Sequence, residues 1–347
     1  MSTVATRPAR RDRHVPHGDV SRRHFLWGTG AALATVGAAG CSSPVAPTTP
    51  APSGAFPVSV PGKEGTATIP AEPNRLFAAG LQRDADIAIA LGVTPVAMAK
   101  AASFTSGIAP WVETRLGQSK PELVDMSGAQ PPLEQIAALE PDLISAVDDY
   151  ALANHYAQFS RIAPTLSYVE AQNIDTWQQS TTRIAQALGR ETQAPGVIAA
   201  TEGAIAQAAG DNPGLRGKTF SFSVVYSGVI YTVLPGDAAA VVLTQLGLQL
   251  APSIAGLPES ATKGRAQVSA EQLSVLDADV TIVSYPTPAE RAAIERNPLF
   301  PSLDAVKRGA YFELEFSLGV ALAFPSPLAT PYAVNGLVPA LNRALSL

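Results

Sequence analysis

Apolar and polar positions along this chain form short buried runs separated by amphipathic stretches. Residues 75–80 predict a buried strand, and the helix that follows is expected to begin at Asp84 as N-cap and to stop at Gly92. Residues 93–99 predict the next strand. A strand, a helix ending at glycine and another strand are typical of a βα unit, so this order predicts a parallel sheet.

The other elements follow from the same periodicities. Weak alternation over residues 56–73 predicts an edge hairpin, and the second half of the chain repeats the βα order. The remaining expected elements are strands at 219–226 and 280–284, and helices at 176–188, 191–209, 237–246 and 330–344. At 1.5 Å per residue the helix at 191–209 would be about 28 Å long, enough to bridge two small lobes.

One short motif occurs twice, 137 positions apart, at residues 134–144 and 271–281. Each copy begins with Glu-Gln and predicts a short helix, a break and a buried strand. Glu134 precedes Asp142 by eight residues, and Glu271 precedes Asp279 by the same interval. Two copies of one unit favour two similar lobes with a cleft between them, which is the architecture of a binding protein.

The N-terminal segment predicts export. Arg22 and Arg23 precede an apolar run of small residues at 27–40, which is too short to cross a bilayer. Paired arginines before such a run indicate a twin-arginine signal peptide over residues 1–40. The run ends at Cys41, the only cysteine, and the sequence before it resembles a lipobox, so we expect lipidation there. Residues 41–55 are rich in Pro, Thr and Ser and predict a disordered tether.

Composition narrows the function. Six of the 24 basic residues but only two of the 29 acidic ones precede Cys41, so the mature part is strongly acidic. That balance argues against nucleic-acid binding, which needs basic patches. His155 is the only histidine after Cys41, and we expect it on an exposed helix face. A carrier of free zinc or manganese would need clusters of histidine and carboxylate ligands, and no metal site is predicted.

Six motifs in order resemble one family, the ferric-siderophore-binding proteins of bacterial ABC importers, whose helical-backbone fold also carries haem and cobalamin. They are Gly65-Thr66-Ala67-Thr68-Ile69-Pro70, Ala90-Leu91-Gly92-Val93, Leu133-Glu134-Gln135-Ile136, Ile162-Ala163-Pro164-Thr165, Ser269-Ala270-Glu271-Gln272-Leu273 and Ala305-Val306-Lys307. The resemblance implies an α/β fold of two Rossmann-like lobes with parallel-rich sheets, joined by a single long rigid helix, with the ligand cleft between the lobes. We expect an N-terminal lobe at 56–190, the bridging helix at 191–212 and a C-terminal lobe at 213–347.

Ligands of open α/β sheets bind beyond the carboxyl ends of the strands. That rule nominates the cationic and aromatic side chains in the loops that follow the strands. The cations are expected to clamp an anionic chelate, and the aromatic rings to form an apolar wall. The candidates are Arg83, Lys100, Phe104, Trp111, Tyr150, Tyr226, Arg265, Tyr285 and Phe316. For each, a packing or surface role is the competing interpretation, and Asp148 and Asp149 are either ligand acceptors or helix caps.

The resemblance also implies partners. In the family a glutamate at the places of Glu134 and Glu271 docks the two halves of the permease, which works with an ATPase. A ferric siderophore is the expected ligand, with haem or cobalamin as the alternative. The protein is expected to be a monomer without a cofactor of its own.

Two rivals come from other classes. Ser260-Ala261-Thr262-Lys263 fits an acyl-enzyme motif, but its partner motifs S-D-N and K-T-G are missing, so an enzyme is not expected. The other rival is an envelope lipoprotein that has kept this fold and lost transport.

Overall fold

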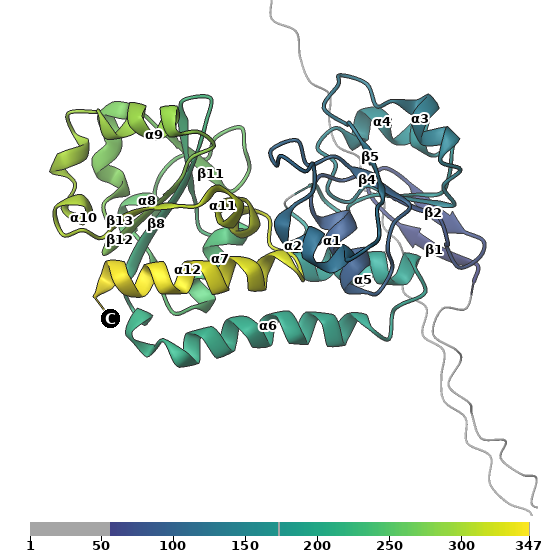
Figure 1. The fold of residues 1–347 in the computed structure, drawn as a ribbon. Coiled ribbons are helices and arrows are strands. Elements are labelled where there is room, and N and C mark those ends of the chain that lie inside the picture. The colour runs from purple at the N-terminus through teal and green to yellow at the C-terminus, as the bar shows by residue number, and fades with distance from the viewer. Residues whose placement is uncertain (1–55, 173, 347) are drawn as a thin grey trace, which may run out of the picture. The chain divides into compact units, whose positions relative to one another are not determined.

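The computed structural model describes residues 56–172 and 174–346 (Figure 1). The predicted signal peptide with Arg22 and Arg23, the predicted lipidation site Cys41 and the predicted tether lie outside this part of the chain. The described chain starts with an antiparallel hairpin of β1 (Val58–Pro61) and β2 (Thr66–Ile69), as the alternation in this region predicts.

The sheet of the N-terminal lobe is parallel in every pairing, with strand order β5-β4-β3-β6-β7. Its strands are β3 (Leu76–Ala78), β4 (Ala97–Ala99), β5 (Glu122–Val124), β6 (Leu143–Ser145) and β7 (Thr165–Leu166). The apolar runs of the sequence predict β3, β4 and β6, whereas β5 and β7 were not predicted. Because all five point the same way, the loops that follow them gather at one edge of the sheet.

Helices join these strands and close the lobe. They are α1 (Arg83–Ala90), α2 (Pro110–Leu116), α3 (Leu133–Ala138), α4 (Leu152–Phe159) and α5 (Trp177–Ala187). The start of α5 is fixed by a reciprocal capping box between Thr176 and Gln179. The start of α1 differs from the prediction, because Gln82 is the N-cap and Asp84 lies inside the first turn.

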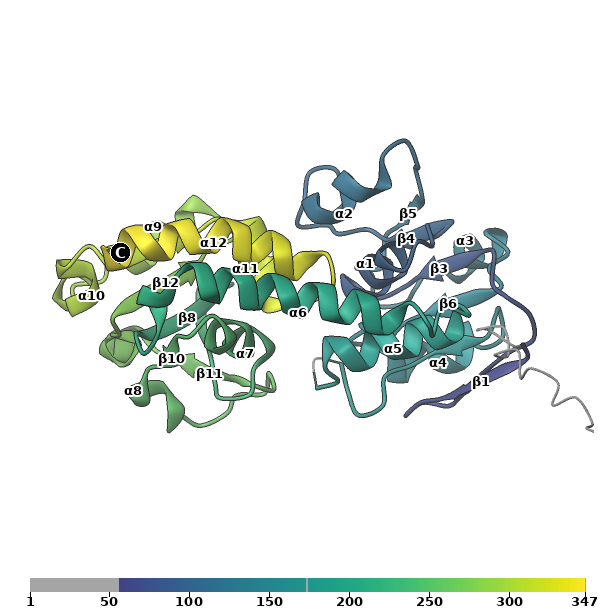
Figure 2. The same cartoon turned by 90° about the horizontal axis from the view of Figure 1, so that it is seen from below.

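A single helix, α6 (Ala194–Asp211), leads out of the N-terminal lobe, with Pro195 in its first turn. It lies beside α5 near its start and beside α12 (Ala329–Leu345) further along (Figure 2). Ala194, Thr201 and Ile205 are its buried residues. This element is the predicted bridging helix, begun three residues later than expected because Pro195 and the turn before it delay the first helical residue.

The C-terminal lobe has a mixed sheet with the order β11-β9-β8-β12-β13, and β10 pairs with the start of β8. Its strands are β8 (Thr219–Tyr226), β9 (Val229–Val233), β10 (Gln249–Leu250), β11 (Arg265–Val268), β12 (Val280–Ser284) and β13 (Tyr311–Leu314). Strands β8, β12 and β13 are parallel, whereas β9 and β11 are antiparallel additions. The second lobe therefore repeats the first only in its parallel part.

Short helices complete this lobe. They are η1 (Pro213–Leu215), α7 (Ala238–Gln245), α8 (Pro252–Ala255), η2 (Ala270–Leu276), α9 (Pro288–Glu295), η3 (Phe300–Ser302), α10 (Asp304–Lys307) and α11 (Phe316–Ala323). Asp237 caps α7 by accepting a hydrogen bond from the N–H of Ala239, so the helix expected at 237–246 begins one residue later. The last helix, α12, contacts α11, α6 and α2.

The repeated motif has the same structural role in both lobes. Asp142 precedes β6 and accepts hydrogen bonds from the backbone N–H groups of Asn74 and Arg75, at the start of the neighbouring β3. Asp279 precedes β12 and accepts from the N–H and hydroxyl of Thr219, the first residue of the neighbouring β8. The aspartate of each copy thus ties its own strand to the next. The helices differ, since the first copy forms α3 and the second the 3-10 helix η2.

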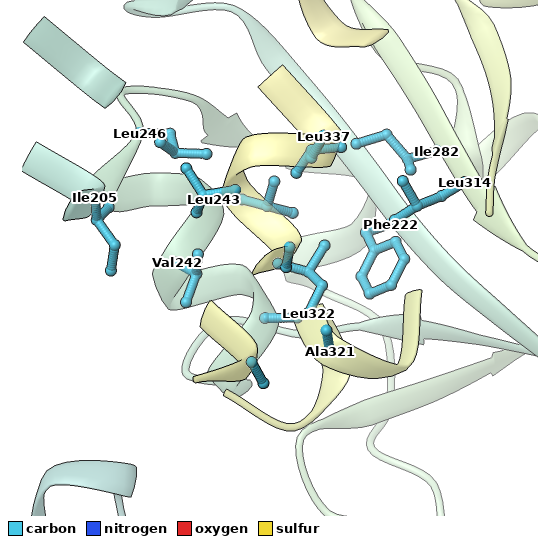
Figure 3. Packing of buried hydrophobic residues seen from close by; sticks show 14 of the residues in the cluster. Ile205, Phe222, Val242, Leu243, Leu246, Ile282, Leu314, Ala321, Leu322 and Leu337 are labelled. Atoms are coloured by element: carbon cyan, nitrogen blue, oxygen red, sulfur yellow. The ribbon is translucent and has the colours of Figure 1, made fainter. Parts of the chain in front are cut away.

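The largest apolar core joins the two lobes. Ala85, Met98, Trp111 and Val112 of the N-terminal lobe belong to the same buried cluster as Phe222 and Leu337 of the C-terminal lobe. Figure 3 shows the C-terminal part of this cluster, where Phe222, Leu243, Leu322 and Leu337 pack between the sheet and its covering helices. Because this core is continuous, separating the lobes would expose apolar surface to water.

Candidate functional site

Two cavities lie at the loops that the strand-end rule nominates. The larger, about 350 Å³, is lined by Tyr285, Pro286, Thr287, Pro288, Glu313, Glu315 and Phe316. These residues follow β12 or sit at the end of β13, two parallel neighbours in the C-terminal sheet. The cavity therefore occupies the carboxyl edge of that sheet, where the fold class places ligands.

The second cavity, about 170 Å³, has walls from both lobes. Ile174 comes from the segment after β7, and Asp237, Lys263, Arg265 and Ala323 come from the C-terminal lobe. Arg265 was predicted to reach the cleft, and it lines this cavity, but its Nε is ion-paired with Asp237 Oδ2 at 3.2 Å. Its charge is balanced there before any ligand enters.

Four aromatic rings form a chain across the boundary between the lobes. Phe104 packs edge-on against Trp111 at 5.9 Å between ring centroids, and against Phe316 of the C-terminal lobe at 6.1 Å. Trp111 in turn lies 5.4 Å from Tyr332 of α12. The structure thus brings together Phe104, Trp111 and Phe316 as an aromatic group, and pairs of this kind each stabilise by about 0.5–1.5 kcal/mol beyond area burial.

Arg83 lies elsewhere than predicted. Only 2% of the residue is exposed, and its guanidinium donates to the backbone carbonyls of Pro325, at 3.2 Å, and Asp175, at 3.4 Å. Pro325 belongs to the C-terminal lobe, so Arg83 links the lobes directly. The competing interpretation of Arg83 as a surface residue is wrong, because Arg83 is the first residue of α1 and is buried at the junction, while its role as a ligand clamp stays a prediction.

The first turn of α1 also holds two fully buried aspartates. Asp84 accepts from the N–H groups of Val147 and Asp148 and from the hydroxyl of Ser145, all within its own lobe. Asp86 accepts from the Ser326 hydroxyl at 2.6 Å and from the N–H groups of Leu328 at 3.0 Å and Ala329 at 3.2 Å. Asp86 therefore caps α12 from the other lobe.

Burial raises the pKa of both Asp84 and Asp86 to about 7, although their hydrogen bonds favour the charged form. The close fit extends to the backbone. A Cβ added to Gly80 would lie 1.8 Å from Asp84 Oδ2, so glycine is required at that position. The spacing of Asp84 and Asp86 was the only sequence signal for the junction between the lobes. The hydrogen-bond partners of both carboxylates lie far away along the chain, so the sequence did not indicate them.

The acidic pair after β6 caps helices. Asp148 is buried, and its Oδ2 accepts from the N–H groups of Gln82 and Arg83 at the start of α1. Asp149 accepts from the N–H of Ala151, just before α4. The sequence analysis expected His155 to be exposed, and this is wrong. His155 is buried on α4, with its Nδ1 3.7 Å from Asp149 Oδ2. The capping interpretation of Asp148 is therefore the one that the contacts support.

The other candidates lie around this region with different exposure. Tyr285 is buried, and its hydroxyl bonds to Tyr311 at 3.0 Å, so only part of it lines the larger cavity. Lys100 is exposed after β4. Tyr150 and Tyr226 are exposed by 57% and 69%, beyond the range expected of packed core rings. Sequence reasoning missed Tyr332, Glu313 and Glu315, which come from a helix face and a strand end without a distinctive motif.

Glu134 and Glu271 are both exposed, as the docking hypothesis requires. Glu134 lies in the first turn of α3 and Glu271 in the first turn of η2. A hydrogen bond from its own backbone N–H and a second from Ser269 hold the pKa of Glu271 below its usual value, so it is charged at neutral pH.

Two further features bear on the kind of site. Within residues 56–172 and 174–346, no group of three or more His, Cys, Asp or Glu side chains is placed to hold a metal ion. In the same part of the chain, no helix combines the length and apolarity needed to cross a bilayer.

Comparison with known proteins agrees with the fold. Residues 80–318 match the Periplasmic binding protein family model. The chain is 29% identical to the putative ABC transporter substrate-binding lipoprotein YhfQ of Bacillus subtilis, over 74% of this chain and 81% of YhfQ. It is 27% identical to the ferric enterobactin-binding periplasmic protein FepB of Escherichia coli, over 75% of this chain and 84% of FepB.

Among solved structures, Streptococcus pneumoniae PiaA in complex with ferrichrome matches with a TM-score of 0.71 and 26% identity. The match covers 83% of this chain and 99% of PiaA. The family model spans more than half of the chain and includes the bridging helix and most of each lobe. This chain belongs to the periplasmic binding protein family.

Proposed function

We propose that this protein is an extracytoplasmic solute-binding protein that captures a ferric siderophore and delivers it to an ABC permease. The observation that carries the proposal is the pair of cavities at the strand ends, one of them lined by both lobes, in a chain of this family. Relatives of this chain are named for ferric enterobactin, and a structural relative holds ferrichrome. The protein acts by binding, without turnover.

The aromatic group at the lobe boundary suits such a ligand. Siderophore chelates are bulky, and pockets for ligands of that size are mostly apolar with a few polar anchors. Phe104, Trp111, Tyr285 and Phe316 would supply the apolar wall, and Lys100, Arg265, Tyr150 and Tyr226 the polar rim. Arg83 would support the site from beneath by holding the two lobes at a fixed separation.

Binding is expected to quench the fluorescence of Trp111, which lies between Phe104 and Tyr332 beside the cleft. We expect saturable quenching by at least one ferric siderophore, with a Kd of about 1 µM or lower, a binding free energy of about −8 kcal/mol. The measurement is a fluorescence titration of the exported protein with ferric siderophores, their iron-free forms, haem and cobalamin.

Two variants make the signal specific. Trp111→Phe should remove most of the quenching, whereas Trp177→Phe, which replaces a buried ring of α5, should keep it. If haem or cobalamin binds more tightly than every siderophore, the proposed ligand is haem or cobalamin and not a ferric siderophore. If none of these ligands binds, a non-transporting envelope lipoprotein becomes the better interpretation.

We also propose export by the twin-arginine route and anchoring through lipid on Cys41, which would keep the protein beside its permease. Arg22→Lys with Arg23→Lys should leave the precursor in the cytoplasm, and Cys41→Ala should release the exported protein from the membrane. Fractionation of cells followed by immunoblotting measures both. Normal export of the double-lysine variant would exclude this route, and membrane retention of Cys41→Ala would exclude the anchor.

Glu134 and Glu271 are proposed to dock the permease. They occupy equivalent places in the repeated motif, one in each lobe, and both are exposed. Carboxylates at matched positions on two lobes suit a partner of two similar halves, because complementary charges orient the encounter.

A further inference from the structure

We propose that the cleft selects a ferric chelate of neutral or positive net charge, as trihydroxamates are, over anionic catecholates and carboxylates. This inference rests on the proposed function and names its substrate class. Overall similarity does not decide the matter, because the chain is equally close to a protein named for ferric enterobactin, which is anionic, and to one that holds ferrichrome, which is neutral.

The wall of the larger cavity is acidic. Glu313 and Glu315 line it, and its other lining residues are Tyr285, Pro286, Thr287, Pro288 and Phe316, with no cation among these seven. Phe316 contacts Phe104 of the opposite lobe, so this wall faces the boundary between the lobes. An anionic chelate that entered here would meet two carboxylates in a partly desolvated site.

The nearest cation is already shared between two carboxylates. Arg291 binds Glu295 through its Nε at 2.7 Å and binds Glu313 through its Nη1. The hydrogen bond that Arg291 donates to Glu295, supported by the charge of Glu313, raises the pKa of Arg291 above its usual value. Arg291 therefore supplies one positive charge beside the three negative charges of Glu295, Glu313 and Glu315. The wall of the cavity keeps a negative potential.

Glu315 adds an acceptor for the ligand. It caps α11, where its Oε2 accepts from the N–H of Leu318 at 3.2 Å and from the hydroxyl of Ser317. Both bonds end on the same oxygen, and no group of the described residues donates a hydrogen bond to Oε1. An ammonium or amide N–H of a chelate is a suitable donor to it, because hydrogen bonds to a carboxylate are short and strong.

Three other cations near the lobe boundary are held by protein groups, and Lys100 is not ion-paired within the described residues. Arg83 is buried against two carbonyls, Arg265 is paired with Asp237, and Lys263 is paired with Glu259 at 2.7 Å. Lys100 is exposed. The hydrogen bonds from Ser127 are the main cause that lowers the pKa of Asp125, and the charge of Lys100 adds to this effect. An anionic chelate in the larger cavity would lose part of its hydration without gaining a cation from the cavity wall, which makes its transfer there unfavourable.

The test is competition among chelates of different charge. The exported protein is titrated with ferrioxamine B, which carries a free ammonium group, and with ferrichrome, ferric enterobactin and ferric citrate. We expect both hydroxamates to bind at least about tenfold tighter than the two anionic chelates. Equal or tighter binding of an anionic chelate would overturn this inference and leave the proposed function intact, whereas no binding of any chelate would overturn both.

A charge variant locates the effect. Glu313→Gln should lower the affinity for ferrioxamine B by about fivefold, the size of one charge interaction at a partly exposed site. The affinity for ferrichrome should stay within about twofold of the wild-type value. Arg291 keeps Glu295 in this variant, so the fold should be retained. Glu202→Gln, an exposed residue on α6, removes the same charge away from the cavity and should change neither ligand. An equal loss for both hydroxamates in Glu313→Gln would contradict an electrostatic role for this wall.

Discussion

Replacing Asp86 by alanine is expected to lower the free energy of unfolding by about 3 kcal/mol. The change leaves the N–H of Leu328 and the Ser326 hydroxyl without their acceptor, and the N–H of Ala329 keeps only Ser326 Oγ at 3.2 Å; each buried group left unpaired costs about 1–3 kcal/mol. It also removes the cap of α12, whose N-cap residue Leu328 has no side-chain acceptor of its own. Urea unfolding followed by circular dichroism measures the loss.

Asp84→Ala is the matched control for this prediction. Asp84 sits two residues earlier on the same helix, is equally buried and also accepts three hydrogen bonds, but its partners lie in the N-terminal lobe. Hydrogen exchange should therefore speed up in the first turn of α12 in Asp86→Ala and stay near the wild-type rate there in Asp84→Ala. Equal protection of α12 in both variants would show that Asp86 does not couple the lobes.

The protonation of Asp86 gives a second control through pH. Its folded pKa is raised to about 7, so the stability it contributes is full below the unfolded pKa near 3.8 and is lost as pH rises through about 7. Asp86→Asn cannot titrate at this site. The stability lost in Asp86→Asn relative to wild type should therefore be larger at pH 5 than at pH 8. A loss that grows with pH would mean that hydrogen bonding outweighs burial and keeps Asp86 charged.

Replacing both Glu134 and Glu271 by lysine is expected to abolish uptake while ligand affinity stays within about twofold. If these carboxylates meet cations on the permease, the double change turns two attractions into two repulsions, and like charges placed opposite each other cost several kcal/mol. Every 1.4 kcal/mol is about a tenfold loss of affinity, so delivery should fall by two orders of magnitude or more. Uptake of radioactive iron as the chelate, in cells that lack the wild-type protein, measures the effect.

Glu202→Lys with Asp211→Lys is the control for docking. Both residues are exposed on α6, and the pair makes the same change in net charge without touching the repeated motif. Uptake in this control should be normal. Single alanine variants at Glu134 or Glu271 should weaken delivery more at low ionic strength, because salt screens exposed charges. Normal uptake by the double-lysine variant would exclude docking through these residues.

The elements of this fold were predictable because each has a local signal. β12 (Val280–Ser284) coincides with its apolar run, and α7 begins where Asp237 caps it. The mixed order of the C-terminal sheet was not predictable in the same way. Strand β9 pairs antiparallel with β8 through the two-residue turn Ser227-Gly228, which is a local pairing. Strand β11 pairs with β9 from a distant segment, with Arg265 opposite Val233, and nothing within β11 distinguishes that pairing from a parallel one.

The candidate site was less predictable than the fold, and Arg83 shows why. Its place after a strand correctly indicated the carboxyl edge of the sheet, but whether its guanidinium faces solvent depends on Pro325, 242 residues away. Glu313 and Glu315 raise the same difficulty. They lie at the end of β13, and only the position of that strand beside β12 makes them a cavity wall.

The cap that Asp86 provides for α12 joins residues 240 positions apart, and this has a consequence for how the chain is completed during synthesis. The N-terminal lobe leaves the ribosome first and can present the acceptor before its partner exists, since domains generally fold in the order in which they are made. The 17 residues of α12 are made after the strands of both sheets. A nascent chain stalled before α12 would expose the apolar side chains that α12 covers in the folded protein. Chaperones and proteases would therefore encounter the chain in that exposed state.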